Sequence, residues 1–385
     1  MSRTLPSFFD TVTVGGRRLN NRFVVAPMTR VSATADGVPT DAMGAYYEAF
    51  AEGGFAAVIS EGLYTDLVAS VANPNQPGLV TPQQVEGWRK ITGRVRRHGT
   101  VFLAQLMHAG ALSQVLEHTL APSTLQPLGK PSASSGGYDA FRMPAAMTPD
   151  DIQTAVDCYV QAARNAVAAG FDGVEIHGAN GYLPDQFLTA YTNHRTDRYG
   201  GSVENRFRFT AEVLTAVRQA VPAGFIVGLR LSESKVNHLS YRWEEGPAMA
   251  EAVFREVKKA APDYLHLAAE GGSWKRESLY ADGRSSTGIA RQMLNVPVIA
   301  NGGLHDLSLA ETLLTTGQAD LLSIGRAAIA NPDFPEKVRW GKALVPFHPK
   351  MIKPSVSLDN TRVYFRETAE AQSLSSCFSP SDSPS

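Results

Sequence analysis

The chain has 385 residues, a formal net charge of −1 and 43% hydrophobic residues, so it is able to bury a large core. This length would suit two average domains, but α/β barrels routinely use it for one. The near-neutral charge gives no electrostatic reason to expect a nucleic acid or an anionic membrane surface as a partner.

Cysteine usage excludes several classes of protein. The two cysteines, Cys158 and Cys377, are too few for a disulfide framework, a structural zinc site or an iron–sulfur cluster. We read them as free thiols of a reducing compartment and expect no metal. No secretory signal is recognisable at the N-terminus, and no apolar run approaches the roughly 18 residues of a membrane span. We therefore expect a soluble cytoplasmic protein.

The predicted elements begin with a hairpin, Val12–Val14 and Arg17–Leu19, joined by Gly15 and Gly16. Short apolar runs then alternate with longer stretches of helical period. The predicted strands are Phe23–Ala26, Ala57–Ser60, Val101–Leu106, Gly173–His177, Ile226–Leu231, Tyr264–Ala268, Val298–Ala300 and Leu321–Ile324. The predicted helices are Pro39–Glu52, Pro82–His98, Pro149–Ala169, Val203–Ala220, Pro247–Ala260, Thr287–Leu294 and Leu307–Thr316.

Strands that alternate with helices predict parallel pairing through right-handed crossovers, and eight such units close into a (β/α)8 barrel. The alternative, an open doubly wound sheet, is disfavoured because the sequence contains no G-x-G fingerprint. Two longer inserts, Ser113–Met147 and Ser232–Glu245, are expected at the barrel mouth. We assign residues 1–372 to the barrel. Residues 373–385 are rich in Ser and Pro and are expected to form a disordered tail.

The last two strand ends predict a phosphate site. Gly302 and Gly303 follow the seventh strand, and Gly325 and Arg326 follow the eighth. Loops at these positions of such barrels frequently bind phosphate through backbone N–H groups, and an arginine offers a fixed fork for it. Either feature taken alone has an ordinary alternative, namely a tight turn for the glycines and a surface ion pair for the arginine.

The end of the fourth strand carries the richest set of polar residues, His177, Asn180 and Tyr182. An imidazole and an amide there are able to donate hydrogen bonds to one carbonyl oxygen, and a phenol is able to deliver a proton. Arg230 ends the fifth strand, where a cation needs an anion nearby. That anion is either a ligand or Glu175, and the two readings are compatible. The Gln105 amide suits an imide-like edge, or it is a core residue bonded to backbone.

At this point the residues resemble those of the old yellow enzyme family of FMN-dependent ene-reductases. Residues 171–206 read FDGVEIHGANGYLPDQFLTAYTNHRTDRYGGSVENR, and the pieces HGANGYL, DQFL, RTDRYGGS and ENR are highly characteristic of that family. The resemblance also includes APMTR, ISEG, QLMHAG, ANGG and SIGRAAIANPDFP. It therefore covers the chain from Pro6 to Pro335.

The resemblance implies a non-covalent FMN, with NADPH or NADH as the hydride donor. It implies that His177 and Asn180 bind the substrate carbonyl and that Tyr182 is the proton donor. Small electrophilic alkenes, either α,β-unsaturated carbonyl or nitro compounds, are the implied substrates, and the chain is expected to be a monomer or a homodimer. The residues implied to hold the cofactor are Pro27, Met28, Thr29, Gly62, Gln105, Arg230, Gly302, Gly303, Gly325 and Arg326.

The chain departs from the family pattern in two places. Ala111 and Leu112 follow QLMHAG, where the family usually has arginine, and the segment after Pro335 lacks the usual glycine- and tyrosine-rich ending. The second departure leaves open which aromatic residue closes the substrate pocket.

Three alternative functions are also compatible with parts of the pattern. A larger flavin and iron–sulfur relative is disfavoured by the missing cysteine cluster. A phosphate-binding aldolase or isomerase barrel would carry no flavin. A barrel that binds FMN without turnover is disfavoured by the intact set of His177, Asn180 and Tyr182.

Overall fold

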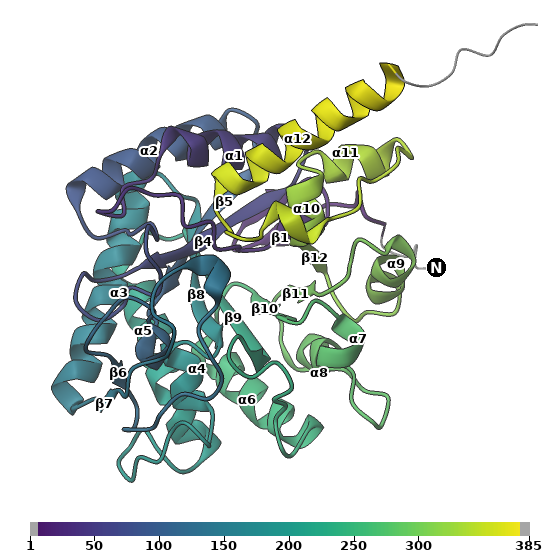
Figure 1. Cartoon of the computed structure of the whole chain (residues 1–385). Helices are drawn as coiled ribbons and strands as arrows, with labels where there is room; N and C mark the ends of the chain where they lie inside the picture. Colours follow the sequence, from purple (N-terminus) through teal and green to yellow (C-terminus); the bar gives the residue numbers. More distant parts are fainter. Residues whose placement is uncertain (1–6, 378–385) are drawn as a thin grey trace, which may run out of the picture.

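The computed structural model describes residues 7–377. Eight parallel strands close into a barrel in the order β10-β11-β12-β3-β4-β5-β8-β9, surrounded by helices (Figure 1). The predicted single (β/α)8 barrel is therefore confirmed. The barrel strands are β3 (Phe23–Val25), β4 (Ala57–Tyr64), β5 (Val101–Met107), β8 (Gly173–Asn180), β9 (Ile226–Lys235), β10 (Leu265–Leu267), β11 (Val298–Asn301) and β12 (Leu321–Ile324).

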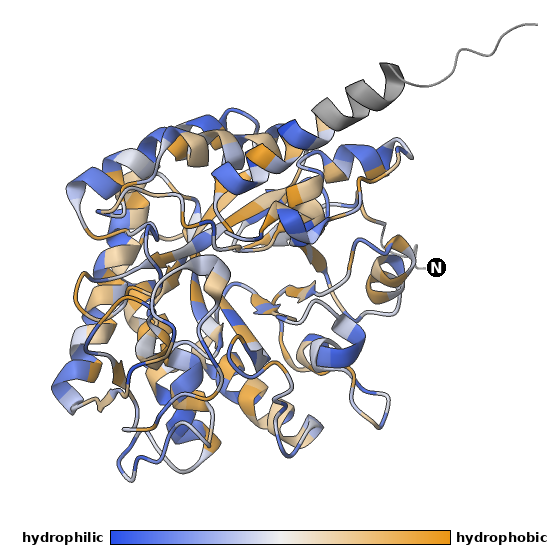
Figure 2. Ribbon diagram, viewed as in Figure 1, coloured by the Kyte–Doolittle hydropathy of each residue, from blue (hydrophilic) through white to orange (hydrophobic). Residues whose placement is uncertain are grey.

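All seven predicted helices are present, with shifts of one or two residues at some ends. They are α1 (Asp41–Glu52), α2 (Pro82–Arg96), α3 (Pro149–Ala169), α5 (Val203–Ala220), α6 (Pro247–Ala260), α8 (Ser286–Met293) and α9 (Leu307–Thr315). Blue and orange alternate along these helices in Figure 2, as expected when one face packs on the barrel. Thr81 and Thr148 form complete capping boxes ahead of Pro82 and Pro149, which fixes where α2 and α3 begin.

The N-terminal hairpin closes one end of the barrel. β1 (Val12–Val14) and β2 (Arg17–Leu19) pair antiparallel, as predicted. At the turn, Gly15 has a φ of +52°, and a Cβ there would lie 2.9 Å from Cγ1 of Ile226. The buried side chains of the hairpin join one apolar cluster with residues at the starts of the barrel strands. The opposite end, where the strands finish, is therefore the end left for a site.

Three strands run at least three residues further than predicted. β4, β8 and β9 extend to Tyr64, Asn180 and Lys235, with register irregularities after Ile59 and Gly178. A bulge interrupts the period of two that marks a strand in sequence, so the residues beyond it resemble a loop. Asn180, which lies beyond the predicted end of its strand, is therefore the last residue of a hydrogen-bonded strand.

Shorter elements complete the chain. These are β6 (Leu120–Ala121), β7 (Ala145–Ala146), α4 (Leu183–Leu188), α7 (Trp274–Ser278), α10 (Arg326–Ala330), α11 (Phe334–Arg339), α12 (Leu358–Cys377) and the 3₁₀ turns η1 (Gly110–Leu112), η2 (Ala133–Ser135) and η3 (Pro349–Met351). α12 continues past residue 372, where we ended the barrel, and contacts α1. The rest of the predicted tail, 378–385, lies outside the described residues. Across 7–377, none of the helices combines the length and apolarity that a membrane crossing requires.

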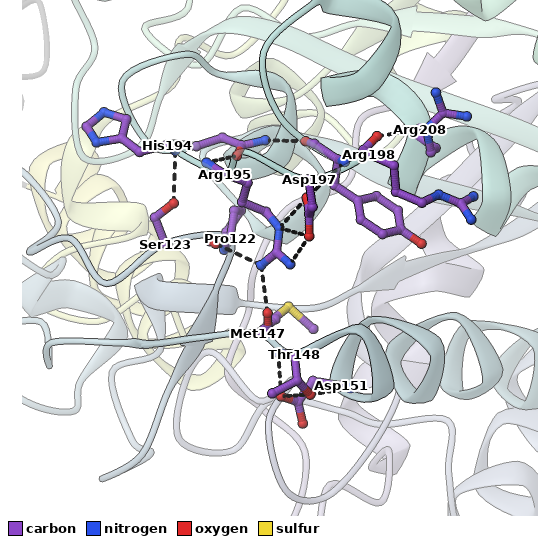
Figure 3. A network of polar contacts seen from close by, with 12 residues as sticks. Pro122, Ser123, Met147, Thr148, Asp151, His194, Arg195, Asp197, Arg198 and Arg208 are labelled. Carbon is purple, nitrogen blue, oxygen red and sulfur yellow. Dashed lines mark hydrogen bonds and ion pairs between the residues drawn. The ribbon is translucent and has the colours of Figure 1, made fainter.

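A side chain of the RTDRYGGS motif holds the insert 113–147 in place (Figure 3). Nη1 of Arg195 donates to the carbonyl oxygens of Pro122, at 3.1 Å, and Met147, at 2.6 Å. Asp197 accepts from Nε of the same arginine at 3.0 Å and so fixes its guanidinium. The two carbonyls follow the short paired strands β6 and β7, so one arginine ties together the two ends of the segment 122–147 within the insert.

Candidate active site

A cavity of about 1030 Å³ occupies the end of the barrel where the strands finish. Every residue that the resemblance assigned to the cofactor or the substrate lines it. They are Pro27, Met28, Thr29, Gly62, Gln105, His177, Asn180, Tyr182, Arg230, Gly302, Gly303, Gly325 and Arg326. The fold thus brings together residues separated by as much as 299 positions (27 to 326). His108, which directly follows β5, accepts from the backbone N–H of Gly110 and shapes a turn.

A bulge at the end of β8 positions His177, Asn180 and Tyr182. Asn180 has a φ of +65°, a left-handed conformation that asparagine tolerates better than most residues. Its backbone N–H donates to Oγ of Ser232 at 2.7 Å. The rings of His177 and Tyr182 meet edge to face, with centroids 5.0 Å apart. All three side chains therefore face one cavity from a short stretch of fixed backbone.

Among the cavity residues that the resemblance assigned to the cofactor or the substrate, three buried polar atoms have no hydrogen-bond partner in the described part of the chain. They are Nδ1 of His177, Oδ1 of Asn180 and Nε of Arg230. An unsatisfied buried polar group costs about 1–3 kcal/mol. Three of them in one cavity indicate a polar ligand that completes their hydrogen bonding.

The protonation states of His177 and Arg230 favour binding of an anion or a polarised oxygen in the cavity. Burial lowers the pKa of His177, and the positive charge of Arg230 lowers it further, so the imidazole is neutral. Burial also lowers the pKa of Arg230, an effect that the carboxylates of Glu175 and Glu270 oppose.

The predicted alternative partner of Arg230 is engaged elsewhere. Glu175 accepts from Nε2 of Gln105 at 2.8 Å and from the phenol of Tyr264 at 3.0 Å, and it contacts Nδ1 of His266 at 2.9 Å. No ion pair joins Arg230 to any of the carboxylates whose side chains the structure describes. Gln105 is thus bonded to a carboxylate rather than to backbone, and its amide oxygen is left for a ligand.

The predicted phosphate loops would allow a ligand to come close to their backbone. Gly302 has a φ of +108°, and a Cβ there would lie 2.6 Å from Cβ of Ala269 and from the N atom of Trp274. Only glycine fits this position. Asn301 ties the neighbouring loops together, since Oδ1 accepts from Ala269 N and Nδ2 donates to Ser323 O, both at 3.1 Å.

Arg326 is exposed beside these loops. None of the side chains that the structure describes forms an ion pair with it, so the surface ion pair that we weighed for it is not seen among them.

A buried carboxylate fixes the segment after the first barrel strand. Oε2 of Glu61 accepts from the backbone N–H of Arg30 at 2.9 Å, directly after Thr29. Oε1 accepts from the phenol of Tyr47 at 3.2 Å. Burial raises the pKa of Glu61 to about 7. Glu61 therefore fixes the backbone segment that carries Pro27, Met28 and Thr29.

Two segments cover the mouth of the cavity. The insert contributes Phe141, and the C-terminal segment 344–356 contributes Phe347. A main-chain hydrogen bond of 2.9 Å from Val356 N to Ser134 O joins the two segments. Phe141 and Phe347 are therefore the candidates for the aromatic residue that closes the pocket.

Sequence reasoning missed Glu270. This carboxylate lines the cavity and accepts from Nδ2 of Asn180 at 2.9 Å. It lies two residues after the predicted sixth strand, Tyr264–Ala268, so the rule that polar residues at strand ends carry the chemistry would have found it.

Comparisons with known proteins agree with this geometry. Residues 7–344 match the NADH:flavin oxidoreductase / NADH oxidase family. The chain is 35% identical over 354 residues to a probable flavin mononucleotide-dependent alkene reductase of Leishmania infantum, covering 89% of this chain and 93% of that protein. It is 33% identical to 12-oxophytodienoate reductase 7 of Oryza sativa subsp. japonica over 347 residues, which are 85% of this chain and 86% of the reductase.

A solved structure of morphinone reductase superposes with a TM-score of 0.80 at 34% identity, covering 91% of this chain and 93% of that one. The family match extends over most of the sequence, and the barrel and the cavity-lining residues agree with it. The chain therefore belongs to the NADH:flavin oxidoreductase family and is an FMN-dependent oxidoreductase of the old yellow enzyme type, an alkene reductase.

Proposed function

We propose that this enzyme reduces the C=C bond of α,β-unsaturated carbonyl and nitro compounds. The observation that carries the proposal is the convergence of three unpartnered buried polar atoms, from His177, Asn180 and Arg230, on one cavity. The names of its relatives, an alkene reductase and a 12-oxophytodienoate reductase, support the same class of substrate.

The residues present fit an FMN. The unpartnered Nε of Arg230 and the amide oxygen of Gln105 suit the polar edge of a flavin ring. Pro27, Met28, Thr29 and Gly62 line the same part of the site, and we propose that they contact the ring. When bound, FMN accepts a hydride from a reduced nicotinamide and supplies it to the alkene.

We assign the phosphate of FMN to the loops after β11 and β12. The backbone at Gly302 and Gly303 has positive φ and lacks side chains that would block an approaching phosphate. Gly325 and the exposed guanidinium of Arg326 complete the site. One phosphate site without a dinucleotide fingerprint favours FMN over FAD.

His177 and Asn180 hold the substrate oxygen. A neutral His177 offers one ring N–H, and Asn180 offers an amide N–H, so together they are able to donate two hydrogen bonds to one carbonyl or nitro oxygen. These bonds strengthen as negative charge develops on the oxygen, which lowers the barrier to attack at the β-carbon.

Tyr182 supplies the proton to the α-carbon. Burial raises the pKa of its phenol, and the negative charge of Glu270 raises it further, so the group keeps its proton at neutral pH. Within the described residues its hydroxyl makes no hydrogen bond, which leaves the proton available to a substrate. Either NADPH or NADH is proposed as the hydride donor.

The decisive experiment is spectroscopic. The purified protein should be yellow, and flavin released by heat should migrate with FMN. Anaerobic addition of NADPH or NADH should bleach the flavin, and cyclohex-2-enone or a nitroalkene should restore the colour. Release of FAD would contradict the cofactor assignment, and failure of every enone and nitroalkene to restore the colour would contradict the substrate class.

A further inference from the structure

Glu270 is the one carboxylate among the described side chains that line the cavity. It lies on the loop between β10 and α7. Its Oε2 accepts a hydrogen bond of 2.9 Å from Nδ2 of Asn180, the amide to which we assign the substrate oxygen.

The backbone of Asn180 is fixed on both sides, but its side chain has a single anchor. The N–H donates to Ser232 Oγ at 2.7 Å, and the carbonyl accepts from the N–H of Val236 at 3.0 Å. Among the side chains that the structure describes, the amide group bonds to Glu270 alone, and its Oδ1 has no partner there.

The single anchor decides which end of the amide faces the substrate. The two ends of an asparagine amide have nearly the same shape, but one donates and the other accepts. A carboxylate only accepts, so it attracts Nδ2 and repels Oδ1. With one N–H on Glu270, the second N–H of Nδ2 stays free for a ligand. If the amide turned over, Oδ1 would occupy that place and face the substrate oxygen, acceptor against acceptor.

We propose that Glu270 is a positioning residue, which holds the Asn180 amide in the orientation that donates to the substrate oxygen. The inference rests on the proposed role of Asn180 and adds a group that does not itself touch the substrate. It predicts that replacing Glu270 affects ligand binding and the reoxidation rate only while Asn180 is present.

A double-mutant cycle tests this dependence. Glu270→Ala should weaken binding of 4-hydroxybenzaldehyde, followed by the absorbance of the bound flavin, by about tenfold, as expected for a hydrogen bond to a charged group. The rate of reoxidation by cyclohex-2-enone should fall similarly. In an Asn180→Ala background, the same Glu270→Ala change should have no further effect on either quantity.

Two further variants separate orientation from charge and from folding. Glu270→Gln keeps an acceptor for Nδ2 of Asn180 and should stay within about threefold of the parent. Glu277→Gln is the matched control, because Glu277 is a buried carboxylate on the adjoining α7 that bonds Ser234 and Arg276 but not Asn180. It should behave as the parent, and all variants should retain FMN.

Several outcomes would overturn the proposal. A loss on Glu270→Ala that persists undiminished without Asn180 would mean that Glu270 acts directly or supports the fold. Parental binding by Glu270→Ala, or an equal loss on Glu277→Gln, would also refute positioning. If the parent bound the phenol with this coupling but reduced no alkene, the proposed function would fail while the positioning role stood.

Discussion

Replacing Tyr182 with Phe removes one oxygen atom from the cavity and should separate the two halves of the catalytic cycle. The ring packs against the imidazole of His177 at a centroid distance of 5.0 Å and against Met107 and two alanines. The hydroxyl bonds to no described residue, so its loss leaves no buried partner unsatisfied. We therefore expect the free energy of unfolding to change by less than about 0.5 kcal/mol.

The effect on alkene reduction should be large. A positioned general acid contributes about 10²–10⁴ in rate, which corresponds to about 2.7–5.4 kcal/mol of barrier. Because the phenol is the proposed acid and its raised pKa keeps it protonated, that contribution should vanish in the variant. Reduction of the bound flavin by NADPH requires no proton from the protein and should stay within about twofold of the parent.

Anaerobic stopped-flow spectroscopy measures both halves. The reduced variant should react slowly with cyclohex-2-enone but close to normally with a nitroalkene, whose nitronate product anion is stable before protonation. Parental reoxidation by cyclohexenone would refute the reasoning, and water or another tyrosine at the mouth would then be the proton source. Slowed reduction by NADPH would instead indicate that Tyr182 helps to bind the nicotinamide.

Three other expectations follow from the contacts. Changing both His177 and Asn180 to Ala should weaken phenol and enone binding, because two hydrogen bonds to the ligand oxygen are lost, while FMN stays bound. Alkene reduction should also slow, since each lost bond to a developing oxyanion costs about 10²–10³ in rate. An unchanged dissociation constant in a phenol titration would make the pair structural. Arg195→Met should destabilise the fold by about 2–4 kcal/mol in urea unfolding, because two carbonyls of the insert lose their donor, whereas the exposed neighbour Arg198→Met should change little. The pKa of Glu61 rises from 4.5 to about 7 on folding, so stability should fall as the pH rises between these values, by up to about 3 kcal/mol, and Glu61→Gln should lose that slope.

The barrel was predictable because its signals are local and repeated. Thr81 and Thr148, each followed by proline, mark helix starts from a few residues of sequence, and both form capping boxes in the structure. The ends of β4, β8 and β9 were not predictable, because bulges let those strands continue by pairing with neighbours far away in sequence. The pairing of Asn180 with Lys235, for example, has no local pattern.

The sequence predicted which residues belong to the candidate site but not the contacts that hold them. Strand-end positions and the family resemblance named thirteen of the lining residues, and the fold brings all thirteen to one cavity. The contacts behind them were not foreseen. We considered Glu175 as a partner for Arg230, but its oxygens are taken by Gln105, Tyr264 and His266, whose side chains converge inside the barrel from other strands. Such choices depend on distances across the barrel, which a linear sequence does not contain.

A common design emerges from these contacts. Three parts of the cavity lining are each held by a carboxylate that accepts a hydrogen bond: Gln105 by Glu175, Asn180 by Glu270, and the backbone after Thr29 by Glu61. A carboxylate accepts and never donates when ionised, so it fixes which end of an amide turns away from the ligand. The free ends are then oriented before any ligand arrives, which removes the ordering that binding would otherwise require. Substitutions of these carboxylates should therefore alter the geometry of ligand binding and the rate of reaction while the cavity keeps its shape.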